Sequence, residues 1–184
     1  MATWWVAGAA LAALAIGVVL FNGLVAARNQ VRAAWSDIDV QLQRRHDLVP
    51  QLVAAVQGYA GYERATLATL AELRTRAMAA ASLADKAQAE GELARQVDRI
   101  LALQERYPDL KASGNFLALQ RDLVGIEDHL QYARRYYNGA VRDLNNRIET
   151  FPSLVVARMA RFQPAAFYRH AGDDGSADVT ATGP

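Results

Sequence analysis

The densest group of ionisable side chains in the sequence is the run Arg44-Arg45-His46-Asp47. A histidine beside an aspartate and an arginine has the groups needed for a general base or for one arm of a metal site. Consecutive residues of a helix point in different directions, however, so i,i+1 pairs do not face each other. A structural ion pair is therefore the favoured interpretation, and catalysis through His46 and Asp47 is the alternative.

Arg45 is the one member of this run that falls on a repeating apolar stripe. The other positions of the stripe, spaced by alternating fours and threes, are Val31, Trp35, Ile38, Leu42, Val49, Leu52, Val56 and Tyr59. Such a repeat places these side chains on one face of a helix, which must be buried against other helices. An arginine on that face needs a carboxylate partner, for which Glu127 and Asp122 are candidates.

Other catalytic chemistry is poorly represented in the sequence. Cysteine is absent, only three histidines occur, and no HExxH, GxSxG, P-loop or GxGxxG motif can be found. The 20 basic and 19 acidic residues are spread along the chain, so no basic face indicates nucleic acid. We therefore expect no enzyme activity, no catalytic, cofactor-binding or metal-binding residues, no cofactor, and no nucleic-acid partner.

The N-terminal segment has the composition of a transmembrane helix. No charged residue lies between Thr3 and Arg28, and residues 4–21 are all apolar or glycine, which is long enough to span hydrocarbon. We predict a short external tail (1–3) and a membrane helix over 4–27. Arginines follow the span and none precedes it, so the positive-inside rule places the N-terminus outside and the helical domain in the cytoplasm. A cleaved signal peptide is the alternative.

Four further helices are expected, over residues 29–60, 63–80, 83–106 and 115–149. The helix boundaries are marked by Gly58 and Gly61, by a capping-box pattern that starts at Ser82, and by Pro108. A loop is expected over 108–114. Pro50 predicts a kink in the first of these helices. The predicted fold class is all-α: an N-terminal transmembrane helix followed by an antiparallel four-helix bundle over 29–150, with two long and two shorter helices.

The segment over residues 151–170 mixes apolar and aromatic side chains with arginines. Such a segment suits either contact with anionic lipid, over residues 151–168, or closure of the open end of the bundle. Residues 171–184 are small, polar and acidic, and we expect them to be disordered.

Three blocks of the sequence resemble the LemA family of bacterial membrane proteins. They are AWSDIDVQLQRRHDLVPQLVAAVQGYA (34–60), YPDLKASGNFLALQRDL (107–123) and RRYYNGAVRDLNNRIETFPS (134–153). The resemblance implies a single N-terminal span with a short external tail and a cytoplasmic helical bundle, and it carries over no catalytic residue. Leu144, Leu154 and Arg161 stand where tyrosine, asparagine and glycine are usual in the family.

The sequence thus predicts a membrane-anchored helical scaffold or adaptor that acts through protein partners of unknown identity or through self-assembly. Small residues in the span, Gly8 among them, favour homo-oligomers. Lipid is the other expected partner, through residues 4–27 and 151–168. The alternatives are a secreted or periplasmic helical binding protein, or an accessory subunit of a membrane enzyme.

Overall fold

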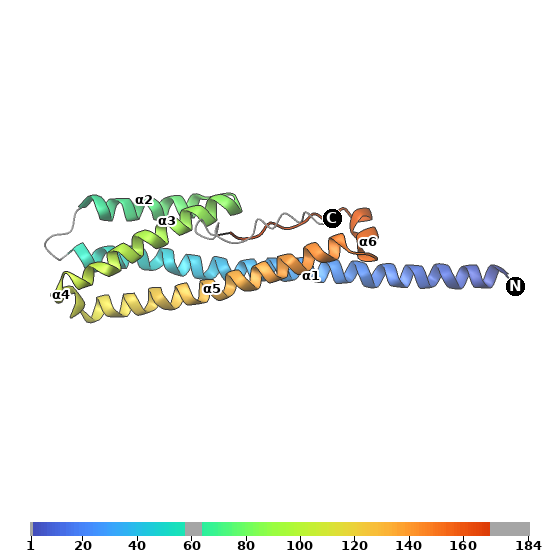
Figure 1. Ribbon diagram of the computed structural model, residues 1–184, viewed down its shortest axis with the longest axis horizontal. Helices are drawn as coiled ribbons and strands as arrows, with labels where there is room; N and C mark the ends of the chain where they lie inside the picture. Colours follow the sequence, from blue (N-terminus) through green and yellow to red (C-terminus); the bar gives the residue numbers. More distant parts are fainter. Residues whose placement is uncertain (1, 58–63, 170–184) are drawn as a thin grey trace, which may run out of the picture. The chain divides into compact units, whose positions relative to one another are not determined.

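The computed structural model describes residues 2–57 and 64–169, and within these ranges every regular element is helical (Figure 1). The elements are α1 (Ala2–Gln57), α2 (Arg64–Ala79), α3 (Leu83–Ala102), the 3-10 turn η1 (Leu103–Glu105), α4 (Pro108–Lys111), α5 (Gly114–Glu149) and α6 (Ser153–Met159). The predicted all-α class with an apolar N-terminal helix is confirmed for these residues. Tyr59, the turn at glycines 58 and 61, and the tail 171–184 lie outside them.

The structure differs from the expected boundaries around Pro108. Helix α3 stops at Ala102, and η1 leads to Tyr107, whose extended backbone (φ −126°, ψ 91°) is the conformation favoured before a proline. Pro108 then opens the short helix α4, where a loop was expected over 108–114. The reason is that proline suits the first turn of a helix, where its missing N–H has no intrahelical partner to lose.

The chain forms two compact units. Among the described residues, the first unit comprises 2–38 and 133–167, and the second comprises 39–57, 64–132 and 168–169. Helices α1 and α5 each contribute one part to each unit.

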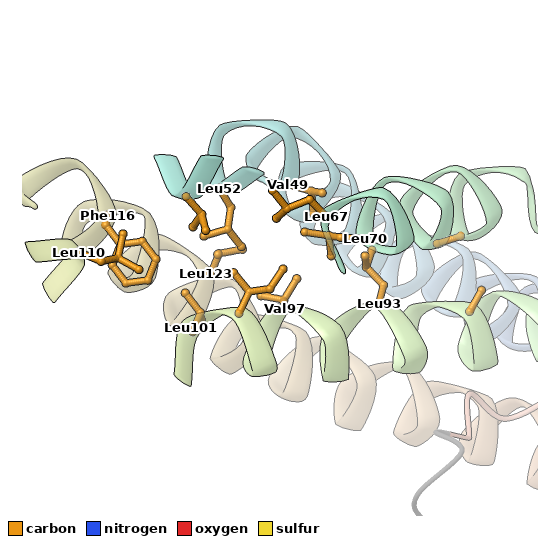
Figure 2. Close-up of a cluster of buried hydrophobic side chains, with 14 residues drawn as sticks. Val49, Leu52, Leu67, Leu70, Leu93, Val97, Leu101, Leu110, Phe116 and Leu123 are labelled. Carbon is orange, nitrogen blue, oxygen red and sulfur yellow. The ribbon is translucent and has the colours of Figure 1, made fainter. Parts of the chain in front are cut away.

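One hydrophobic core in the second unit is shared by α1, α2, α3, α4 and α5 (Figure 2). Its buried members are Val49, Leu52, Val56, Leu67, Leu70, Ala77, Ala89, Leu93, Val97, Ile100, Leu101, Leu110, Phe116 and Leu123. On each longer helix most of these residues are spaced by three, four or seven positions, as amphipathic helices around a common core require. In this unit the stripe predicted on α1 is buried at Leu42, Val49, Leu52 and Val56.

The first unit has its own core between α1 and the last part of α5. The buried side chains are Leu24, Ala27, Val31, Ala34, Ile38, Tyr137, Ala140, Val141, Leu144, Ile148 and Ala157. The rings of Trp35 and Tyr137 meet edge to face, with centroids 5.7 Å apart. Leu144, one of the departures from the family pattern, is thus a core residue.

Side-chain amide and hydroxyl groups of α5 hold the chain that follows α6. Asn145 makes two hydrogen bonds to Ala165: its Nδ2 donates to the carbonyl at 3.0 Å, and its Oδ1 accepts from the amide at 2.9 Å. The hydroxyl of Tyr137 donates to the carbonyl of Ala166 at 3.0 Å. Burial raises the pKa of Tyr137, which keeps the phenol in its donating form.

Helix α6 ends in a Schellman motif. The amide of Phe162 donates to the carbonyl of Ala157 at 2.9 Å, and that of Arg161 to Arg158 at 3.2 Å. Arg161 adopts φ 53°, the left-handed conformation that glycine provides without strain. Glycine stands at this position in the family pattern that the sequence resembles, and the left-handed backbone is a physical reason for a glycine there.

The N-terminal part of α1 exposes its apolar side chains. It is long and apolar enough to cross a membrane, and Trp4, Leu11 and Val19 are among the side chains left open. The exposed run ends near Asn22, because Leu24 and Ala27 are buried in the core of the first unit. The uncovered apolar stretch is therefore shorter at its C-terminal end than the predicted span 4–27.

Candidate functional site

The run Arg44-Arg45-His46-Asp47 lies on α1 in the second unit, and two of its members are buried. The side chains of Arg45 and His46 are 4% and 5% exposed. The expectation that Arg45 alone would be buried is wrong. Leu42, Arg45, His46 and Val49 follow the i, i+3, i+4, i+7 spacing, and a helix face that contacts several neighbours is wide enough to bury both middle positions.

Glu90 of α3 joins these two neighbouring side chains. Its fully buried carboxylate places Oε1 at 2.7 Å from Nε2 of His46 and Oε2 at 3.5 Å from Nη1 of Arg45. Arg45 and His46 are consecutive and point in different directions, but each contacts a different oxygen of the Glu90 carboxylate. Glu90 is a site residue that sequence reasoning missed. The available signal was its position three residues before Leu93, at the start of the apolar stripe of α3.

Arg45 has a second carboxylate partner, Glu127 of α5, whose Oε2 pairs with Nη2. The sequence named Glu127 and Asp122 as candidates, and the structure confirms Glu127. Asp122 is exposed and lines an open surface hollow of about 430 Å³. A buried guanidinium is costly unless its charge is compensated, and here two carboxylates from different helices compensate it.

A proline accounts for one further contact of this cluster. Pro50 has no N–H to donate to the carbonyl of His46 four residues earlier, which would leave that carbonyl unpaired. Nε of Arg74, from α2, donates to it at 2.7 Å. Helix α1 therefore continues through Pro50 to Gln57 with its missing hydrogen bond replaced from a neighbouring helix.

The charges of the cluster affect the pKa of Asp98 on α3. The residue is exposed overall, but partial burial of its carboxyl group raises the pKa above the ordinary 3.8. The Glu127 carboxylate raises the pKa further, and the Arg45 guanidinium acts in the opposite direction. Folding thus disfavours the ionised form of Asp98.

The remaining members of the run, Arg44 and Asp47, are separated from the buried pair. Both line the open hollow together with residues of α5, including His129. Asp47 accepts a hydrogen bond from Gln43 at 3.0 Å. The structure therefore brings Arg45 and His46 together with Glu90 and Glu127, and it places Asp47 on the surface. Among residues 2–57 and 64–169, no three His, Asp or Glu side chains are arranged to hold a metal ion.

The arrangement is a buried, charge-compensated link between helices α1, α2, α3 and α5. Its groups pair with one another and satisfy a backbone carbonyl, which is the chemistry of a structural network. Together with the exposed apolar part of α1, it defines an all-helical, membrane-associated protein.

The family assignment agrees with this class. The LemA family model matches residues 34–181, and the chain belongs to the LemA family. Protein LemA of Metamycoplasma hominis is 28% identical over 85% of this chain and 74% of its own length. Magnetosome proteins MamQ 1 and MamQ 2 of Paramagnetospirillum magneticum are each 24% identical over 89% of this chain and 70% of their own length. These relatives are not named as enzymes.

Proposed function

We propose that this protein is a single-pass membrane scaffold or adaptor, and not an enzyme. Residues 29–150 form an antiparallel four-helix bundle on the cytoplasmic side, and the N-terminus lies outside. The bundle binds other proteins, or further copies of this chain, at the membrane surface. Neither a cofactor nor nucleic acid takes part.

The continuity of α1 is the observation that carries this proposal. One helix, Ala2–Gln57, supplies both the exposed apolar segment and the buried stripe of the helical core. A partner bound to the helical part is therefore held to the membrane through a single covalent helix. Such coupling suits a protein whose role is to hold partners in place.

The buried charge cluster supports a non-catalytic role. A general base must reach the proton that it removes, directly or through one water. His46 is almost fully covered, and Glu90 lies against its Nε2 atom at 2.7 Å. Asp47, the proposed catalytic neighbour, lies on the surface instead.

Reporter fusions and N-terminal mass spectrometry test the membrane part of the proposal. A C-terminal fluorescent protein, which matures in the cytoplasm, should fluoresce, and a C-terminal alkaline phosphatase, which needs an oxidising compartment, should be inactive. The mature chain should retain residues 4–27. Active phosphatase would reverse the orientation, and loss of the first residues would favour a released binding protein.

Cysteine crosslinking tests self-assembly, because the chain contains no native cysteine. Single cysteines can be placed at exposed positions of α1: Leu14→Cys in its apolar N-terminal part and Val40→Cys nearer its C-terminal end. If the chain associates with itself, these variants should give disulfide-linked dimers in membranes. If every position returned only monomer, self-assembly would be rejected, and capture of other proteins from solubilised membranes would then test the adaptor role.

A further inference from the structure

We propose that α6 lies in the headgroup layer of an anionic bilayer, as a second membrane contact beside the apolar span of α1. The inference rests on the proposed membrane anchoring and adds to it a lipid-binding surface. This surface consists of Phe151, Val155 and Met159 with the nearby arginines Arg28, Arg147, Arg158 and Arg161.

An apolar face of α6 is uncovered. Val155 is 50% exposed and Met159 81%, and the two lie one helical turn apart. Phe151, which precedes the helix, is 83% exposed. The opposite side of the helix packs onto the protein through Ala157, which is buried. Large apolar side chains gathered on one exposed face indicate a binding surface for a partner or for lipid.

The contacts of Phe162 place α6 at the end of the apolar span. The ring of Phe162, which follows α6, meets the ring of Phe21 edge to face, with centroids 6.0 Å apart. Arg28 lies 5.1 Å above the same ring. Phe21 is one of the last exposed residues before Leu24 enters the core, so α6 is fixed at the level where the uncovered apolar stretch stops.

The length of that stretch matches a bilayer. Residues 3–22 rise about 30 Å at roughly 1.5 Å per residue, which is the thickness of a hydrocarbon core. Nη1 of Arg147 lies 3.5 Å from the carbonyl of Gly23, and a charged guanidinium belongs at the headgroup level. Phe21 and Phe162 sit where aromatic side chains are enriched at membrane interfaces.

The positive charges around α6 favour lipids with anionic headgroups. Arg28, Arg147, Arg158 and Arg161 are all exposed, and between positions 147 and 161 the sequence has one acidic residue, Glu149. Arg158 shares the exposed face with Val155 and Met159, so its long side chain can reach phosphates while the apolar residues contact acyl chains. This excess of positive charge fits anionic phospholipid headgroups. Closure of the bundle end, the alternative use of this segment, leaves the exposed face unexplained.

Depth measurement with the full chain in nanodiscs tests the placement. Single cysteines replace Met159, Val19 in the span, or Met78 on α2, each exposed in the structure. After labelling with bimane, nitroxide-bearing lipids should quench the label at Met159→Cys and Val19→Cys and leave Met78→Cys bright. Quenching at Val19→Cys alone would overturn the α6 proposal and leave the anchor intact. Quenching at neither position would reject the anchor itself.

Lipid selectivity tests the arginines. The preference of the full chain for phosphatidylglycerol over phosphatidylcholine, measured by native mass spectrometry of retained lipid, should fall about 5-fold for each arginine removed. The test variant is Arg158→Gln with Arg161→Gln, and the matched control is Arg95→Gln with Arg99→Gln, two exposed arginines of α3. Equal loss in both variants, or none in the test variant, would overturn the anionic-lipid proposal. A Met159→Cys disulfide between copies would assign the face to a second chain instead.

Discussion

The Nε2 atom of His46 lies 2.7 Å from Oε1 of Glu90, in a place where neither side chain is appreciably open to solvent. The other oxygen of the same carboxylate faces Arg45, the residue next to His46 in the sequence. One acidic side chain of α3 thus fixes two consecutive residues of α1. Removing it takes the carboxylate partner from His46 and one of two carboxylate partners from Arg45, which keeps Glu127.

Glu90→Gln should destabilise the protein by about 3 kcal/mol, the lower end of the cost of breaking a buried ion pair, because Arg45 retains Glu127. Urea unfolding of the full chain in detergent, followed by far-ultraviolet circular dichroism, measures the change. Glu92→Gln is the matched control on the same helix. Glu92 pairs with Arg76 where both side chains reach solvent, so its loss should cost at most about 1 kcal/mol. Equal costs would contradict the special role of Glu90.

A double-mutant cycle should detect the pairing of Arg45 with Glu127. The free energies of unfolding of Arg45→Met, Glu127→Gln and the double variant should give a coupling of about 1–3 kcal/mol, since the two side chains are in contact. The same cycle with Asp122→Asn in place of Glu127→Gln should give a coupling below about 0.5 kcal/mol. A larger coupling through Asp122 would show that the cluster is assembled differently in solution.

Arg74 should matter only while residue 50 is a proline. Arg74→Met removes the donor to the carbonyl of His46, and an unpaired buried carbonyl costs about 1–3 kcal/mol. In a Pro50→Ala background the alanine N–H can donate to that carbonyl, so the same substitution should cost little. Unfolding free energies of the two single variants and the double variant check this. If Arg74→Met destabilised the Pro50→Ala variant as much as the parent, the contribution of Arg74 would not depend on the proline.

Asp98→Asn should stabilise the protein at neutral pH. Because burial and Glu127 raise the pKa of Asp98 in the folded state, the favourable contribution of its neutral form is fully present below the unfolded value of 3.8. That contribution is lost as pH rises through the folded pKa. The difference in unfolding free energy between Asp98→Asn and the parent should therefore grow from near zero below pH 3.8 towards neutrality. A difference that is independent of pH would contradict the assignment.

Arg161→Gly should stabilise the C-terminal part of the first unit by about 0.5–1 kcal/mol. Glycine removes the cost of about 1–2 kcal/mol that a left-handed conformation imposes on an arginine, and its greater freedom in the unfolded chain offsets part of the gain. Arg158→Gly, inside α6, should instead destabilise by about 0.5–1 kcal/mol. Thermal unfolding of the full chain distinguishes the two signs, and a loss of stability in both variants would refute the strain argument.

The helices were predictable because apolar periodicity is a local property. The spacing of Leu42, Val49, Leu52 and Val56 states which face of α1 must be buried, and the burial pattern agrees. Pro108 was expected to end a helix, but α3 already stops at Ala102, and the proline instead begins α4. Sequence spacing alone does not decide between a loop and one turn of helix.

The charge cluster was only partly predictable, because its partners come from different helices. The stripe identified Arg45 and the need for a carboxylate, and Glu127 was one of two candidates. Glu90 and the burial of His46 depend on which helix faces α1 at that level, which no spacing within one helix specifies. Arg161 illustrates the same limit, since its left-handed backbone closes a Schellman motif that the arginine itself does not favour.

The burial of Leu24 and Ala27 has a practical consequence for dissecting the molecule. A hydropathy profile would suggest deleting everything up to Ala27 to obtain a water-soluble fragment. Such a cut would remove two packed side chains and expose the surfaces that they cover. A fragment that begins at Gly23 keeps both side chains. We expect this shorter N-terminal deletion to give the folded, soluble domain.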